Sequence, residues 1–430
     1  MISLPYFILR FATSGGLLAA GLLQTFVFAH VLTPKEFSIY ILSAALGVSM
    51  WLFDLGMTKI LFVRLRADHL AGADTSAVAA QANAVAILYA ILVIAGSLIH
   101  FGVLATRPSI SIWQAAEFAL FFLFAALNLV WFVLRNLSVA VDKYIYFESL
   151  EAVRRVGHML ALIAMLVGLP LPIFLLAVNL LWIVLFVLAV IPLVRLGALR
   201  LGLRGVSGQI FVFFSENRAA ALFTSMQAVS ELYLHNILYL VVPIVFGLGA
   251  PIIILDTTLK VFFGVLTVCA AACDLLLPRQ TSAFAKGDRP ALLRATLAAA
   301  ALCSIPVLLI GAVLMFAADP LFALLLGPAA HMPAALAPIF PVLLAAGVLK
   351  TVSSFLLTHT GYFKECARLS VFIGLLMTVV MSAAALMHFD IIGFLRLYAA
   401  SFALGAIFYA WQAVRGPIGA APEKLSRYPT

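Results

Sequence analysis

Two pairs of ionisable residues lie four positions apart within otherwise apolar segments of the chain. Asp256 and Lys260 fall on one helix face with the acid N-terminal, which is the favourable order for an ion pair. Such a pair either neutralises itself or opens when an anionic ligand competes for the lysine. Glu231 and His235 also share a face, and they could carry a proton, since histidine titrates near neutrality, or form a structural hydrogen-bonded cluster.

Four further charges lie in or beside apolar segments, where an ionisable group normally faces a cavity or a partner. Lys350 lies near the middle of its apolar segment. Lys59 and Arg10 lie near the ends of theirs, where they could form a cationic entrance or extend to lipid phosphates. We therefore predict an anion site built from Lys59, Lys260 and Lys350, with Arg10 at its entrance. Asp54 could couple to an ion or substrate, contact another helix, or cap and orient the lobe.

The elements that must position these residues are membrane-spanning helices. The chain has 430 residues, of which 65% are hydrophobic and only 10% are charged, and its mean hydropathy is +1.18. This composition is typical of an integral membrane protein rather than a soluble domain. Stretches of about 20 apolar residues predict twelve spans, at 11–32, 38–62, 78–104, 113–134, 147–168, 172–194, 216–242, 251–277, 293–317, 336–358, 367–387 and 391–413.

Most of the 26 lysines and arginines fall in alternate loops between these spans. This asymmetry predicts that both termini are cytoplasmic, because cytoplasmic loops carry the excess of cations. Arg154 and Arg155 are assigned to the cytoplasmic set, so no arginine is expected in the middle of a span. The net charge of +9 then indicates contact with anionic membrane lipids and not with nucleic acid.

The spans divide into two six-helix lobes around the largest predicted cytoplasmic connection. The predicted parts are an N-terminal lobe at 1–195, a basic linker at 196–215, a C-terminal lobe at 216–414 and a cytoplasmic tail at 415–430. Each lobe would begin on the same side of the membrane, because six is even. A pseudo-two-fold axis along the membrane normal would therefore relate them, as in parallel-repeat transporters.

Several segments resemble bacterial polysaccharide flippases, the O-antigen and exopolysaccharide repeat-unit exporters of the multidrug/oligosaccharidyl-lipid/polysaccharide superfamily. The segments VLTPKEFSIYIL and LFDLGMTKILFVR are similar to the first loop and second helix of that family. Three later segments agree with it in order. They are LLLPRQTSAFAKGDRPALLR (Leu275–Arg294), FAADPLFALLLGPA (Phe316–Ala329) and LLTHTGYFKECARLSVF (Leu356–Phe372).

The resemblance implies alternating access around a central cationic cavity in the bacterial cytoplasmic membrane. The implied substrate is a polyprenyl-pyrophosphate-linked oligosaccharide, which moves from the inner to the outer leaflet for surface polysaccharide synthesis. It also implies possible partners in a polysaccharide polymerase and other assembly proteins, and possible coupling to H⁺ or Na⁺. The lysines would act as point charges, without the bidentate phosphate geometry of arginine.

Two other functions remain open from the sequence. A cation-coupled multidrug exporter of the same superfamily would favour an acidic cavity, which Asp54, Glu231 and Asp256 could supply. A membrane enzyme such as a glycan polymerase would need a large external loop, but the longest predicted one, 317–335, offers only Asp319 and His331. No cofactor, metal-binding or nucleotide-binding motif is found, so we expect a transporter and not an enzyme.

Overall fold

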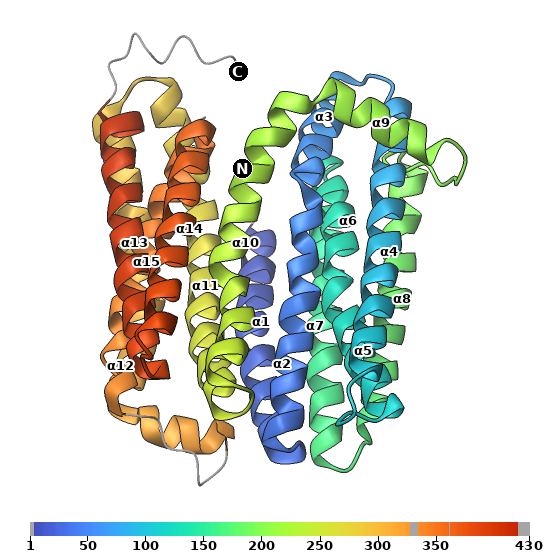
Figure 1. The fold of residues 1–430 in the computed structure, drawn as a ribbon. Helices are drawn as coiled ribbons and strands as arrows, with labels where there is room; N and C mark the ends of the chain where they lie inside the picture. The colour runs from blue at the N-terminus through green and yellow to red at the C-terminus, as the bar shows by residue number, and fades with distance from the viewer. Residues whose placement is uncertain (1–3, 327–333, 361, 420–430) are drawn as a thin grey trace. The chain divides into compact units, whose positions relative to one another are not determined.

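Helices make up most of the described part of the chain. The structure is a computed structural model, and it describes residues 4–326, 334–360 and 362–419 (Figure 1). The α-helices are α1 (Leu4–Val31), α2 (Pro34–Ser49), α3 (Met57–Ala71), α4 (Ser76–Ala105), α5 (Ile112–Ala126), α6 (Asn128–Ala140), α7 (Tyr144–Leu166), α8 (Leu171–Arg195), α9 (Val206–Glu216), α10 (Arg218–Phe246), α11 (Ala250–Ala285), α12 (Arg289–Leu326), α13 (Ile339–His359), α14 (Phe363–Leu386) and α15 (Ile391–Ala413). Short helical turns are η1 (Met50–Asp54), η2 (Ala334–Leu336) and η3 (Val414–Ile418).

The predicted all-helical membrane protein is confirmed. Among the described residues, 10 helical segments are long and apolar enough to cross a membrane. The other two predicted spans, 147–168 and 216–242, correspond to α7 and α10. Helices are the expected spanning elements because each satisfies its own backbone hydrogen bonds in lipid.

The outward faces of these helices are apolar. Leu98 on α4 is 65% exposed and Leu308 on α12 is 70% exposed. Many other large apolar side chains are exposed on α8 and α12, among them Leu180 and Ile183. A soluble protein rarely leaves such a continuous apolar surface in water, so these faces are suited to lipid.

Packing divides the chain into two compact units. The N-unit is the continuous stretch Val31–Leu240, and the C-unit joins Met1–His30 to Val241–Thr430. This grouping differs from the predicted lobes, because α1 packs with the helices of the second half. The physical reason is a close approach to α11, where a Cβ atom added at Gly264 would collide with Leu18.

In the N-unit, small residues let helices approach closely, and aromatic residues fill the space around them. Gly47 on α2 packs against α5, where an added Cβ would lie 2.6 Å from the carbonyl oxygen of Phe122. The buried core includes Tyr89, Trp131 and Trp182. The Trp131 and Trp182 rings meet edge-on, with their centroids 5.4 Å apart, which positions α6 against α8.

The predicted span 38–62 is interrupted in the structure. α2 and η1 end at Asp54, and the chain reverses its helical hand at Leu55 (φ 46°) and Gly56 (φ 75°) before α3 begins. Left-handed backbone is favourable only for glycine, so Leu55 requires support from its surroundings. Ser225 on α10 supplies part of that support by donating a hydrogen bond to the Leu55 carbonyl oxygen over 2.9 Å.

In the C-unit, α11 packs against α12 and α13, and α13 packs against α15. Gly347 on α13 makes room for α11, because a Cβ added there would lie 2.8 Å from Phe262. Tyr409 on α15 exchanges a 2.7 Å hydrogen bond with Ser370 on α14. These contacts fix the three C-terminal helices, which lie side by side in Figure 1.

Candidate functional site

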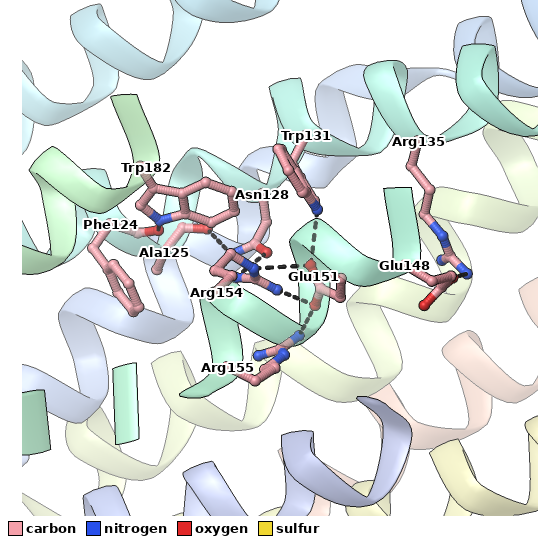
Figure 2. A network of polar contacts seen from close by, with 10 residues as sticks. All are labelled: Phe124, Ala125, Asn128, Trp131, Arg135, Glu148, Glu151, Arg154, Arg155 and Trp182. Atoms are coloured by element: carbon pink, nitrogen blue, oxygen red, sulfur yellow. Dashed lines mark hydrogen bonds and ion pairs between the residues drawn. The ribbon is translucent and has the colours of Figure 1, made fainter. Parts of the chain in front are cut away.

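A buried cluster of charged residues lies in the middle of α7. Glu151, Arg154 and Arg155 are three and four positions apart, so they share one helix face. The Arg154 guanidinium pairs with both carboxylate oxygens of Glu151. Arg155 approaches the same carboxylate from the other side, with 2.7 Å between its terminal nitrogen and Glu151 Oε1. Figure 2 shows the carboxylate between the two guanidinium groups.

Neighbouring helices hold this cluster in place. Trp131 on α6 donates its indole N–H to Glu151 Oε2 over 2.9 Å, and Arg154 donates to Asn128 Oδ1 over 3.3 Å. The Arg154 guanidinium also lies over the Trp182 ring of α8, 4.4 Å from its centroid. Stacking on an indole face is favourable for a desolvated cation. Three helices therefore fix the position of Arg154 (Figure 2).

The cluster carries more positive than negative charge. Two arginines share the single carboxylate of Glu151, and a separate pair joins Arg135 to Glu148 over 3.2 Å. The Arg155 side chain is 17% exposed against 6% for Arg154. Its buried Nε atom finds no hydrogen-bond partner within the described part of the chain. Arg155 therefore retains donor capacity, which suits a phosphate group, since guanidinium binds phosphate oxygens in a bidentate manner.

Arg154 and Arg155 are counted with the cytoplasmic cations in the sequence analysis, although the predicted span 147–168 contains both. The structure places both inside α7, with Arg154 buried and Arg155 partly buried. The signal that could have revealed them is their spacing from Glu151. A carboxylate three and four residues before two arginines allows a helix to carry those cations into an apolar environment.

The predicted ion pair on α11 is present. Lys260 Nζ lies 2.6 Å from Asp256 Oδ2, and it also donates to Thr25 Oγ1 of α1 over 3.0 Å. Asp256 is buried, whereas the Lys260 side chain is 22% exposed. The pair is thus neutral as a unit, and its ammonium group is partly accessible. Its role in binding an anion stays a prediction.

Lys350 on α13 is buried among aromatic side chains of α15. Its ammonium nitrogen lies 5.9 Å from the centroid of the Phe402 ring and 5.7 Å from that of Tyr409. Contact with two ring faces stabilises a cation in an apolar environment. Within the C-unit, Lys350 and Lys260 thus have different neighbours.

Asp54 caps the helix that follows the break. Its Oδ1 atom accepts hydrogen bonds from the Thr58 backbone N–H over 3.2 Å and from the Thr58 hydroxyl. The Tyr89 hydroxyl of α4 donates to the same oxygen over 2.7 Å. Asp54 therefore caps the start of α3 and ties it to α4 through Tyr89, while its coupling to an ion or substrate stays a prediction.

The remaining predicted site residues have side chains outside those that the structure describes. They are Lys59 and Arg10 of the predicted cationic site, and Glu231 and His235 of the predicted proton-carrying pair. Their roles stay predictions. Across the described residues, no group of three or more histidine, cysteine, aspartate or glutamate side chains is placed to hold a metal ion.

Comparison with known proteins gives a clear likeness in structure alone. No protein-family model matches the sequence, and no curated protein matches it either. Solved structures do match over nearly the whole chain. An outward-facing multidrug resistance MATE family transporter of the MOP superfamily gives a TM-score of 0.61 at 14% sequence identity, covering 99% of this chain and 97% of its own.

Two other transporters extend this likeness. An inward-facing multidrug resistance MATE transporter gives a TM-score of 0.56 at 15% identity, covering 100% of this chain and 97% of its own. A MOP superfamily transporter from Pyrococcus furiosus gives a TM-score of 0.56 at 13% identity, covering 98% of this chain and 92% of its own. The reversed polarity of its binding pocket suggests a different function for that protein. The chain therefore has the fold of the MATE transporters of the MOP superfamily.

Proposed function

We propose that this protein is an alternating-access transporter that moves an anionic, lipid-linked oligosaccharide across the membrane. The substrate class is a polyprenyl-pyrophosphate glycan, carried from the inner to the outer leaflet of a bacterial cytoplasmic membrane with both protein termini on the cytoplasmic side. Similar structures are known in inward-facing and outward-facing forms, which supports alternating access. They are transporters and not enzymes, which supports a function without covalent chemistry.

The buried cationic cluster on α7 is the observation that carries this proposal. A pyrophosphate has more negative charge than a carboxylate, so it can compete with Glu151 for Arg155. Glu151 would then keep Arg154 and the Trp131 N–H as partners. In this mechanism Glu151 holds Arg155 in position before the substrate arrives, and the bound headgroup replaces one of the two arginine contacts.

The C-unit carries its own cations that could bind an anionic headgroup. Lys260 is partly exposed and paired with Asp256, so an anionic headgroup could draw the ammonium group away from the carboxylate. Lys350 is held over aromatic rings and would act as a fixed charge. The Pyrococcus furiosus transporter supports an anionic substrate in place of a cationic drug, because its reversed pocket polarity suggested a different function for a protein of the same fold.

A cation-coupled multidrug exporter is the second candidate. The observation in its favour is that two of the similar structures are multidrug resistance transporters. The carboxylates Asp256 and Asp54 could serve such a function. Both are already bound by described donors, Asp256 by Lys260 and Asp54 by Thr58 and Tyr89, which makes a cationic substrate the weaker candidate.

Transport by the purified full-length protein in vesicles would separate these candidates. We expect translocation of a fluorescent short-chain polyprenyl-pyrophosphate disaccharide, measured by its accessibility to a membrane-impermeant quencher. Arg155→Gln should reduce the rate roughly tenfold or more, the factor expected for loss of one charge-assisted contact. Arg155→Lys should retain part of the rate, because it keeps the charge but not the bidentate geometry.

Two controls make this experiment decisive. Arg107→Gln, a change in an exposed arginine of the loop between α4 and α5, should leave transport unaltered. Efflux of a cationic dye should not be detected. Dye efflux that persists in Arg155→Gln, together with no movement of the lipid-linked sugar in the native protein, would refute the glycan proposal and favour the multidrug exporter.

A further inference from the structure

A cavity of about 690 Å³ opens at the turn between α11 and α12 in the C-unit. Arg279 and Lys286 line it from α11, seven residues apart and therefore on one helix face. Arg294, Ala295 and Ala298 line it from α12. This turn belongs to the segment Leu275–Arg294 that resembles the flippases, and the proposed transport site does not use it.

The charged end of this cavity is cationic. Arg279, Lys286 and Arg294 are exposed, and across the described residues none of them forms an ion pair with a carboxylate. Asp288 also lines the cavity, but its Oδ1 atom accepts the Ala291 backbone N–H over 3.0 Å and so caps α12. The N-terminus of this long helix adds a partial positive charge at the same place.

The opposite end of the cavity is apolar and lies deeper along the helices. Ala298 is nine residues beyond the start of α12, about 14 Å of helix rise. Small side chains at Ala295 and Ala298 leave the space open. Arg279 and Lys286 follow Leu277, the last residue of the apolar run of α11, and Arg294 lies in the first turns of α12. The cavity therefore runs from a charged mouth at the predicted cytoplasmic surface into the apolar span.

We propose that this cavity binds the phosphate-bearing headgroup of a lipid in the adjoining leaflet. The three cations would contact phosphate oxygens, and the alanine-lined end would hold the first carbon atoms of the lipid. Two lipids share this chemistry, an anionic phospholipid and the lipid-linked pyrophosphate. Binding of the lipid-linked pyrophosphate rests on the proposed function, whereas binding of a phospholipid does not.

Arginine and lysine together suit this ligand. The guanidinium groups of Arg279 and Arg294 can each contact two phosphate oxygens, and Lys286 adds a flexible point charge. Arg294 is partly oriented already, because its Nε atom donates to the Pro290 carbonyl oxygen over 3.3 Å. Cations at the surface of a membrane also attract anionic headgroups over a longer range.

Lipid binding to the purified full-length protein tests the site. Native mass spectrometry would be used to titrate bound dioctanoyl phosphatidylglycerol, with dioctanoyl phosphatidylcholine and inorganic phosphate as comparisons. We expect phosphatidylglycerol to bind, and the double variant Arg279→Gln with Lys286→Gln to raise its dissociation constant about fivefold for each charge removed. Arg107→Gln with Lys35→Gln removes two charges from loops elsewhere in the chain and should change nothing.

A second variant tests the apolar end without altering charge. Ala298→Phe should fill the cavity and weaken lipid binding, while Arg279, Lys286 and Arg294 remain. Equal binding of phosphatidylglycerol by the native protein and both sets of variants would overturn the proposal. Binding of inorganic phosphate that is as tight as lipid binding and insensitive to Ala298→Phe would overturn it too, by identifying a free-anion site.

Competition then identifies the lipid. Displacement of phosphatidylglycerol by a short polyprenyl pyrophosphate would support the transported lipid as the ligand, and a lack of displacement would support a resident phospholipid. Both results support a lipid-phosphate site.

Loss of glycan transport in Arg155→Gln with intact lipid binding would show that the two sites are independent. Absent transport in the native protein with intact lipid binding would refute the proposed function and leave this site standing.

Discussion

At the scale of single residues, the two arginines of α7 differ in their contacts. Arg154 pairs with Glu151, donates to Asn128 and lies over the Trp182 ring. Arg155 pairs with Glu151, and its side chain is more exposed than that of Arg154. Arg154 is therefore a structural residue that orients the carboxylate, and Arg155 is the one suited to an incoming anion.

This difference predicts that the two arginines contribute unequally to stability. Arg154→Gln should lower the free energy of unfolding by about 2–4 kcal/mol, because a buried charge network loses one member. Arg155→Gln should lower it by less than about 1 kcal/mol, since Glu151 keeps Arg154 and Trp131. Unfolding of detergent-purified protein, followed by tryptophan fluorescence, would measure both. A larger loss in Arg155→Gln than in Arg154→Gln would contradict the assignment.

The candidate site was only partly predictable from the sequence, for a physical reason. The period of the helix fixes which side chains share a face, so the ion pair of Asp256 with Lys260 followed from their spacing alone. Thr25, the second partner of Lys260, is 235 positions away and depends on how α1 packs. Arg154 and Arg155 were counted as cytoplasmic cations, although the predicted span 147–168 contains them, because a dense group of charges lowers local hydropathy whether or not the charges neutralise one another.

At the scale of secondary-structure elements, the break between η1 and α3 shows where a hydropathy pattern fails. Residues 38–62 are mostly apolar, and a helix tolerates isolated glycines such as Gly47 and Gly56, so a continuous span was predicted. The break depends on Asp54 as a cap, on Tyr89 and on Ser225. Two of these partners come from other helices, and a local pattern cannot indicate their positions.

Close packing of α2 on α5 gives a prediction at the same scale. Gly47→Ala should destabilise the protein, because the new Cβ atom would lie 2.6 Å from the Phe122 carbonyl oxygen and 2.7 Å from Ala125 Cβ. We expect a cost of about 1–3 kcal/mol, the range for overpacking. The thermal midpoint of the purified protein would measure it.

Gly102 offers a matched control within α4. A Cβ added there meets nothing within 4 Å, so Gly102→Ala should be neutral or stabilise the protein by up to about 1 kcal/mol through helix propensity. If Gly47→Ala raised the thermal midpoint as much as Gly102→Ala did, that result would contradict the close contact between α2 and α5.

At the scale of the whole molecule, the grouping of α1 with α11 is the feature that hydropathy did not predict. Apolar stretches indicate which segments can cross the membrane, but they carry no information about which helices become neighbours. That information lies in small residues such as Gly264, which accommodates Leu18. The fold was thus predictable as a set of spans, and the unit to which α1 belongs was not.

A cross-link would test this grouping directly. An ideal Cβ at Gly264 lies 3.0 Å from Leu18 Cβ, and a small separation of the two helices would bring the pair to the ~3.8 Å typical of Cβ atoms in a disulfide. In a chain whose native cysteines are replaced by alanine, Leu18→Cys with Gly264→Cys should therefore oxidise readily. A protease site between α8 and α9 would divide the chain, and non-reducing electrophoresis should show the two fragments still joined.

Leu18→Cys with Gly311→Cys is the control pair. A Cβ at Gly311 meets nothing within 4 Å, so its two fragments should separate after proteolysis. Joined fragments in both pairs, or in neither pair, would be inconsistent with α1 as a neighbour of α11.

The two units also differ in when the ribosome can supply their parts. The N-unit is one uninterrupted stretch, so all its helices are available as soon as residue 240 has been synthesised. The first helix of the C-unit, α1, must wait until α11 emerges, more than 200 residues later. At typical synthesis rates this interval is roughly 10–40 s. During that time Leu18 and Thr25 lack their partners on α11, so newly made α1 is the segment most open to insertion factors and quality-control proteases.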